Sequence, residues 1–122
     1  MIVELRMSGI FQSMKEYSSP AIEKVSLPEV MQALSDPCRI AIVRAILEKG
    51  ELACNEVPLK VAKATRSHHF TILREAGLLS TRTAGTKCLS SIRTEEINTR
   101  FPGLLDLVVH HGKPTKPKKL KK

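Results

Sequence analysis

The spacing of apolar and polar residues predicts two helices in the first half of the chain, each with its own start signal. Ser26 and Glu29 have the spacing of a capping box, and a proline between them suits a first helical turn. Asp36 and Pro37 begin the second helix, and Gly50 ends it. The residues expected to face the core are Val30, Met31 and Leu34 in the first helix, and Ile40, Val43, Ile46 and Leu47 in the second.

Two further helices are predicted in the middle of the chain. A short one is expected over residues 52–57, and a longer one over residues 64–76 that ends at Gly77. Phe70 and Leu73 mark the inward side of the longer helix, because they are three residues apart. Its outward side then carries Thr65, His68, Thr71, Ile72 and Glu75.

The last third of the chain predicts a hairpin followed by a helix. Residues 78–82 and 87–92 are rich in Leu, Thr, Ser and Ile and flank a glycine-containing loop, residues 83–86. Thr94 is expected to cap the last helix, which Phe101-Pro102-Gly103 kinks or interrupts. Helices followed by a small β-hairpin predict a mainly α fold of the winged helix-turn-helix kind. The apolar residues of the last helix are Ile97, Leu104, Leu105, Leu107, Val108 and Val109.

Length and composition narrow the class of protein. A chain of 122 residues is long enough for one ordinary core and too short for two. Its apolar and charged fractions, 42% and 26%, are those of a soluble globular protein. No apolar run is long enough to cross a bilayer, and early charges interrupt any signal sequence. Three cysteines are read as reduced thiols, so we expect a cytoplasmic protein without membrane contact.

Basic charge is concentrated in two places. The last eleven residues hold six lysines and no acid, and residues 60–93 hold seven basic side chains and one acidic one. Residues 60–93 are strongly basic, whereas the rest of residues 1–111 is acidic on balance. This concentration of positive charge favours a polyanion partner, although a solvated surface explains it equally well. We divide the chain into an N-terminal arm or helix (1–25) expected to help dimerisation, a winged helix-turn-helix domain with a C-terminal dimerisation helix (26–111), and a disordered basic tail (112–122).

Two segments resemble the ArsR-type (ArsR/SmtB) winged helix-turn-helix repressors. Residues 34–43, Leu-Ser-Asp-Pro-Cys-Arg-Ile-Ala-Ile-Val, are similar to the family segment A-L-A-D-P-T-R-L-x-I-L. Residues 67–78 read S-H-H-x-x-x-L-R-E-A-G-L, which is similar to the family's recognition helix and the turn after it. The resemblance covers roughly residues 28–93. Arg66 stands where the family has an apolar residue, and it falls on the inward side of the helix.

The resemblance implies a bacterial or archaeal homodimer that represses transcription by binding double-stranded DNA at an inverted repeat. The terminal helices would form the dimer interface. Thr65, Ser67 and His68 would read the major groove, whereas His69 would pack in the fold. Arg82 and Lys87 would hold the flanking backbone or minor groove. The expected DNA-binding residues are Lys63, Thr65, Arg66, Ser67, His68, Arg82, Thr83, Gly85 and Lys87.

The signal that controls such a repressor is left open by the sequence. Metal-sensing members carry E-L-C-V-C-D-L, whereas here residues 51–57 read Glu-Leu-Ala-Cys-Asn-Glu-Val, so both thiolate positions are lost. Small half-buried thiols are the plain interpretation of Cys38, Cys54 and Cys88, and a redox role is the alternative, with Cys88 expected to lie far from the other two. Asp106 and His110 are half of a tetrahedral metal set, so we expect neither a metal nor a cofactor.

Two other classes of function compete with a specific repressor. An enzyme would need a nucleophile–base pair or a metal site, and no such arrangement is recognised here. A protein that coats nucleic acid without specificity would also use basic residues, and it would bind many duplexes with nearly equal affinity. A metal-responsive repressor that uses ligands of the C-terminal helix is a third alternative. Four aromatic residues are too few for a single-strand binder.

Overall fold

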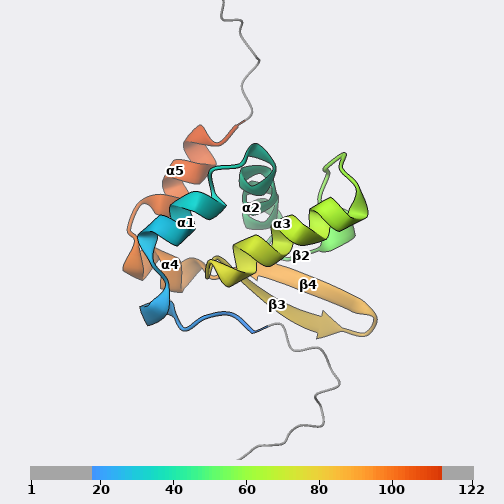
Figure 1. Cartoon of the computed structure of the whole chain (residues 1–122), viewed down its shortest axis with the longest axis horizontal. Coiled ribbons are helices and arrows are strands. Elements are labelled where there is room, and N and C mark those ends of the chain that lie inside the picture. The colour runs from blue at the N-terminus through green and yellow to red at the C-terminus, as the bar shows by residue number, and fades with distance from the viewer. Residues whose placement is uncertain (1–17, 114–122) are drawn as a thin grey trace, which may run out of the picture.

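The computed structural model describes residues 18–113, so most of the predicted N-terminal arm and nearly all of the basic tail lie outside the described residues. The described part is drawn in Figure 1. Its elements in chain order are η2 (Ile22–Lys24), α1 (Leu27–Ala33), α2 (Pro37–Lys49), β2 (Leu52–Ala53), η3 (Cys54–Glu56), α3 (Lys63–Glu75), β3 (Leu79–Ala84), β4 (Lys87–Ile92), α4 (Thr94–Arg100) and α5 (Leu104–His111).

The predicted starts of α1 and α2 are confirmed by their cap hydrogen bonds. The Oγ of Ser26 accepts a hydrogen bond from the backbone N–H of Glu29 at 3.3 Å. The Oδ1 of Asp36 accepts two, from the N–H of Cys38 at 2.7 Å and of Arg39 at 3.3 Å. These bonds satisfy amides that have no partner within the helix, and they fix where each helix begins.

One core joins all five helices to the sheet. Ile42, Ile46, Leu73, Leu78 and Ile97 are fully buried within it. The apolar face predicted for α1 is correct for Val30 and Leu34 but wrong for Met31, whose exposed fraction is 51%. Ala33 fills the inward position instead, because it is three residues beyond Val30 and so lies on the same side of the helix.

The predicted helix over residues 52–57 is wrong. Leu52 and Ala53 form the edge strand β2, which pairs antiparallel with Ser90 and Leu89 of β4. A single 3-10 turn, η3, follows, and the carboxylate of Glu56 accepts a hydrogen bond from the N–H of Ala53 at 2.7 Å. Six residues are too few to repay helix nucleation, whereas the open edge of β4 offers ready backbone partners.

The predicted hairpin is confirmed, with a tighter turn than the sequence indicated. Strands β3 and β4 pair as far as Ala84 opposite Lys87, so the turn has two residues and not four. Gly85 takes a φ of +66°, which the first position of a type II′ hairpin turn requires and a side chain disfavours. The sheet order is β2-β4-β3.

The last predicted helix is divided into two helices. Of the two predicted alternatives, a kink or an interruption, the interruption is correct. Residues 101–103 separate α4 from α5. The prediction that Thr94 caps this helix is wrong, because Arg93 is the N-cap of α4 and Thr94 is its first residue. The hydroxyl of Thr94 donates to the carbonyl of Ile92. In the described part of the chain, no helix is both long and apolar enough to cross a membrane.

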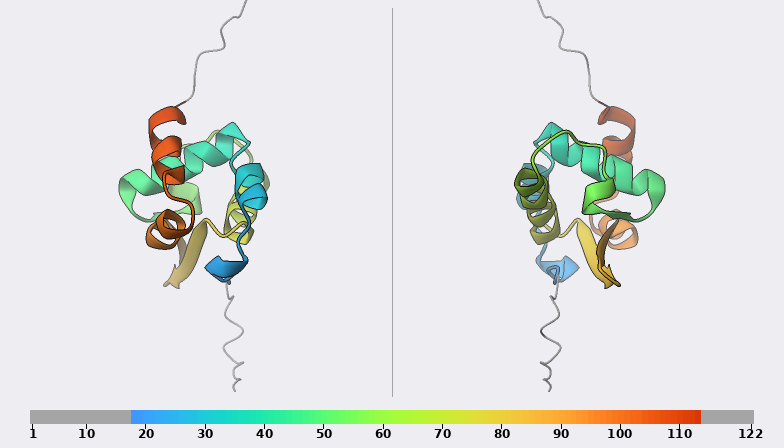
Figure 2. Two further views of the ribbon diagram at one scale, coloured as in Figure 1. Left: turned by 90° about the vertical axis from the view of Figure 1, so that its left-hand side faces the viewer. Right: turned by 90° about the vertical axis from the view of Figure 1, so that its right-hand side faces the viewer.

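Residues 18–25 lie against the body of the fold beside the hairpin, as Figure 2 shows. The hydroxyl of Ser19 donates to the carbonyl of Leu79 at 2.7 Å, and Arg93 donates to the carbonyl of Pro20 at 2.8 Å. Val25 is buried against Gly77, which has a φ of +92° and leaves no room there for a Cβ atom. This glycine therefore ends α3 and also lets the N-terminal segment dock.

Candidate nucleic-acid interface

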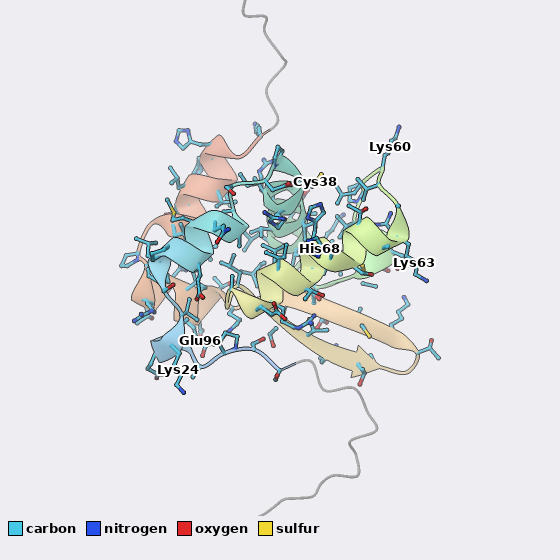
Figure 3. The ribbon with its side chains drawn as sticks, viewed as in Figure 1. Lys24, Cys38, Lys60, Lys63, His68 and Glu96 are labelled. Atoms are coloured by element: carbon cyan, nitrogen blue, oxygen red, sulfur yellow. The ribbon has the colours of Figure 1, made fainter. Side chains whose placement is uncertain are left out.

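The leading half of α3 presents polar side chains to solvent and apolar ones to the core. Thr65, Ser67 and His68 are exposed, whereas Phe70 and Leu73 are buried, as the helical wheel predicted. Figure 3 shows Lys63 at the start of this helix and His68 further along it. The wheel was less accurate at the far end, where Thr71 and Ile72 are half-buried and Ile72 packs against the core.

A buried polar contact with α2 holds α3 in place. His69 is buried, as expected for a packing histidine, and its Nδ1 lies 3.1 Å from Nη1 of Arg39. The Nε of Arg39 donates to the carbonyl of Ala33 at 2.6 Å. The start of α2, the end of α1 and the middle of α3 are thereby joined, so His68 and Thr65 face outward from a fixed helix.

Asp36 belongs to the same group of polar side chains. Burial raises the pKa of its carboxyl, but hydrogen bonds from two backbone N–H groups and the charges of Arg39 and His69 outweigh that effect. The net result is a pKa below the ordinary value. Asp36 is therefore an anion at neutral pH that caps α2 and also complements the charge of Arg39.

The first turn of α3 adds an electrostatic attraction for phosphate. Ala62 precedes the helix, and among the described residues no side chain caps its first N–H groups. These N–H groups carry the positive end of the helix dipole, and Lys63 adds a full charge at the same place. Anions are therefore favoured where Thr65 and Ser67 are exposed.

The wing, defined as the β3–β4 hairpin, lies with its tip at the same end of the molecule as the start of α3 (Figure 1). Thr83, Gly85 and Lys87 are exposed near this tip, as is Arg82 further down β3. Of these four predicted DNA contacts, Lys87 is the one that lines a cavity together with residues of α3. The wing and the leading half of α3 adjoin each other, because Lys63 and Ser67 of α3 line the same cavity as Lys87 of the wing.

The basic residues of the wing are already paired with carboxylates. Arg82 donates two hydrogen bonds to Glu51, at 2.8 and 2.9 Å, and Lys87 lies 3.6 Å from Glu56. The hydrogen bonds and charge of Arg82 hold the pKa of Glu51 below its ordinary value, and that of Arg82 is raised in turn. Sequence reasoning missed both acids, because their pairing depends on β2 adding to the edge of β4.

Comparison with known proteins shows the family to which the chain belongs. No family model matches the chain. Over 81 residues it is 42% identical to YceK of Bacillus subtilis (strain 168), an uncharacterized HTH-type transcriptional regulator, and the match covers 64% of this chain and 81% of that protein. A second regulator of the same description, MJ1325 of Methanocaldococcus jannaschii, is 35% identical over 60 residues, which are 48% of this chain and 67% of that protein.

This chain belongs to the HTH-type transcriptional regulators.

Solved structures show which form of the fold this regulator has. The repressor PagR of Bacillus anthracis superimposes with a TM-score of 0.55 at 23% identity, covering 66% of this chain and 90% of that one. The repressor BigR of Xylella fastidiosa gives 0.51 at 23% identity, covering 62% and 85%. A regulator of the ArsR family gives 0.54 at 24% identity, covering 66% and 89%. The regulator therefore has the winged helix-turn-helix fold that its sequence predicted.

Arg66 of the regulator points inward from α3, as the helical wheel predicted. Its Nη2 donates to the carbonyl of Leu59 at 3.2 Å, and its Nε is buried without a hydrogen-bond partner in the described part of the chain. The guanidinium therefore faces the loop before α3 and not the exposed surface of that helix. The prediction that Arg66 contacts DNA therefore rests only on its place in the sequence, near Lys63 and Ser67 at the start of α3.

One group of three metal-ligating side chains exists among residues 18–113. Ligand atoms of Asp36, Cys38 and His69 lie within 4.8 Å of one another. The guanidinium of Arg39 already contacts His69 there, and its charge opposes a bound cation. This group is therefore explained by the contact between α2 and α3. Asp106 and His110 are exposed on α5, where residues 18–113 supply no third ligand of these types.

The three cysteines are not arranged as predicted. Cys54 and Cys88 line the same cavity and interact electrostatically, so the expectation that Cys88 lies far from Cys54 is wrong. The reason is again the strand β2, which brings the residue after it next to β4. All three cysteines are half-buried, and none of them is in a disulfide in this structure.

Proposed function

We propose that this regulator is a repressor that binds double-stranded DNA as a homodimer at an inverted repeat. The observation that supports this best is the exposure of Thr65 and His68 on the leading half of a helix held rigidly by its buried side. A helix of about 10–12 Å diameter fits a major groove about 12 Å wide, so these side chains can reach base edges. PagR and BigR, which share the fold, are described as repressors.

The remaining predicted DNA-binding residues, apart from Arg66, whose guanidinium faces the loop before α3, act as positioning contacts in this proposal. Lys63 and Ser67 would contact phosphate at the start of α3, where the helix dipole favours anions. Arg82, Thr83, Gly85 and Lys87 would contact the flanking backbone through the wing. Such contacts supply affinity and register without base preference. The six lysines of the tail would add salt-dependent affinity, and the proposed site of action is the cytoplasm.

Exposed apolar side chains on two helices support a dimer. Leu107 and Val109 of α5 and Leu27 and Met31 of α1 are exposed, at 54% for Leu107. Both helices lie at the end of the molecule away from the wing tip (Figure 1). An interface at that end would leave both α3 helices available, and two copies would contact sites about 34 Å apart, or one turn of DNA.

Selection from a random duplex library tests the proposed function. We expect the protein to enrich one inverted repeat, and we expect the bound complex to sediment with two protein copies. A protein that enriches no sequence and binds all duplexes with equal, strongly salt-dependent affinity would instead be the coating protein considered above.

The dimer is tested separately with variants of α5. Leu107→Glu places a charge at the most exposed large apolar residue of that helix, so we expect dissociation to monomers in sedimentation and loss of binding to the full repeat. His110→Ala, on the same helix and also exposed, is the matched control and should remain dimeric. A Leu107→Glu protein that stays dimeric would place the interface elsewhere.

A further inference from the structure

A cavity of about 460 Å³ lies between the start of α3, the turn η3 and strand β4. It holds two thiols together with cationic and polar side chains of the proposed DNA-binding surface. Because the cavity is open to solvent on one side and both cysteines are half-buried, a small molecule can reach the sulfur atoms. Among its lining residues are Cys54, Asn55, Lys63, Arg66, Ser67 and Cys88.

Strand pairing brings the two cysteines to the same part of the sheet. Ala53 ends β2 and pairs with Leu89, and Cys54 and Cys88 are the next residues beyond that pair, at the start of η3 and within β4. An ion pair between Glu56 and Lys87, 3.6 Å long, also links η3 to β4. Because both cysteines line one cavity and interact electrostatically, a disulfide needs a movement of η3 and no change in the sheet.

The surroundings of the pair favour a disulfide over a bound metal. A soft cation needs three or four donors, and the group of three ligands in residues 18–113 lies elsewhere, around His69. Lys63 and Arg66 also line the cavity, and their charges oppose a cation while they stabilise a thiolate. Two sulfurs are enough for a reversible two-electron oxidation.

The thiol of Cys54 is linked directly to the proposed DNA-binding surface. Burial raises its pKa, and the charge of Arg66, a hydrogen bond from the side chain of Ser67 and the charge of Lys63 offset part of that rise. Ser67 and Lys63 are exposed on the first turns of α3. A change of bonding at this sulfur therefore alters contacts of two residues that the proposed function assigns to phosphate.

We propose that Cys54 and Cys88 form a dithiol–disulfide switch, which a low-molecular-weight disulfide oxidises and whose oxidised form binds DNA more weakly. The effect on DNA rests on the proposed function, whereas the formation of the disulfide does not. The bond would pull η3 towards β4 and remove the hydrogen bond between Cys54 and Ser67. The start of α3 would then lose a contact that holds its side chains in place.

The reaction proceeds in two exchange steps. One protein thiolate attacks the small disulfide, which forms a mixed disulfide and releases one small thiolate. The second protein thiol loses its proton and attacks the protein sulfur of the mixed disulfide, which releases the other small thiolate. The two released thiolates take up the two protons. The protein pair is oxidised by two electrons and the small disulfide is reduced by two.

Peptide mapping after equilibration in a glutathione buffer tests the disulfide itself. We expect the full-length protein to form a Cys54–Cys88 bond that excess reduced glutathione reverses. Cys54→Ser and Cys88→Ser should each prevent it, whereas Cys38→Ser, which changes the cysteine outside this cavity, should not. Cys54→Ala is a second variant in case serine at position 54 disturbs the fold. Any other intramolecular pairing, or none under oxidising buffer, would overturn the proposal.

Binding of the selected duplex tests the coupling. We expect oxidation to weaken binding by at least about tenfold in wild type and in Cys38→Ser, and to leave Cys88→Ser unchanged. A disulfide that forms without any change in affinity would overturn the switch. If the reduced protein binds no duplex selectively, the proposed function fails, and the mapping experiment alone still decides whether the dithiol site exists.

Discussion

The leading half of α3 and the wing form one surface, but their side chains start from different states. Thr65 and His68 are exposed on a helix fixed by its buried side, whereas Arg82 and Lys87 are bound to Glu51 and Glu56. A base edge can therefore meet the helix directly, while a phosphate must displace a carboxylate from the wing. Exposed ion pairs contribute little to stability because water screens them, so replacing the carboxylate by a phosphate costs little free energy. We infer that α3 supplies discrimination and the wing supplies modest affinity.

The largest effect is expected from His68→Ala. Loss of a base contact should weaken binding to the selected duplex by about 1–3 kcal/mol, measured by titration at fixed salt. Glu75→Gln is the matched control, because Glu75 is exposed at the far end of α3, and it should change the affinity little. Equal losses on selected and random duplexes would contradict the role assigned to His68.

Asp36→Ala tests whether the fixed position of α3 depends on the polar group at the start of α2. Removal of this cap should lower the free energy of unfolding by about 0.5–2 kcal/mol, measured by urea denaturation. Because folding lowers the pKa of Asp36, its contribution is present above the ordinary carboxyl pKa and is lost as pH falls through the folded value. The difference between wild type and variant should therefore shrink in acid. A difference that stays constant with pH would show that the charge is not involved.

The smallest effects on DNA affinity are expected from two variants of the wing ion pair, Arg82→Gln and Glu51→Gln. These two effects should have opposite signs. Arg82→Gln should weaken binding to all duplexes alike and only slightly, and it should reduce the salt dependence by about one charge. Glu51→Gln releases Arg82 from its carboxylate, so it should strengthen binding to all duplexes. If Glu51→Gln instead weakens binding, the ion pair would be needed to hold Arg82 in the geometry that DNA requires.

The sequence predicted the helices well because their signals are local. Ser26, Asp36 and Gly77 act on neighbours within a few residues, and the buried face of α3 follows from a spacing of three between Phe70 and Leu73. Short cooperative elements of this kind can be identified without knowledge of the fold.

Apart from local errors such as the inward position predicted for Met31, the features that the sequence did not predict depend on strand pairing over a distance. Strand β2 exists because the edge of β4 is open to it, and nothing within residues 52–57 distinguishes a strand from a short helix. The pairing of Arg82 with Glu51 and the closeness of Cys54 to Cys88 are consequences of that one strand. The DNA-binding residues themselves stay predictions, since they depend on a partner.

The central claim is that α3 determines which sequence is bound and the wing does not. Repeating the duplex selection with a Thr65→Ala/His68→Ala double variant and with Arg82→Gln tests it most directly. We predict that the α3 variant enriches a degenerate or altered repeat. Arg82→Gln should enrich the same repeat as the wild type, although it should need a lower salt concentration to bind. An unchanged repeat for the α3 variant, together with an altered one for Arg82→Gln, would contradict the account.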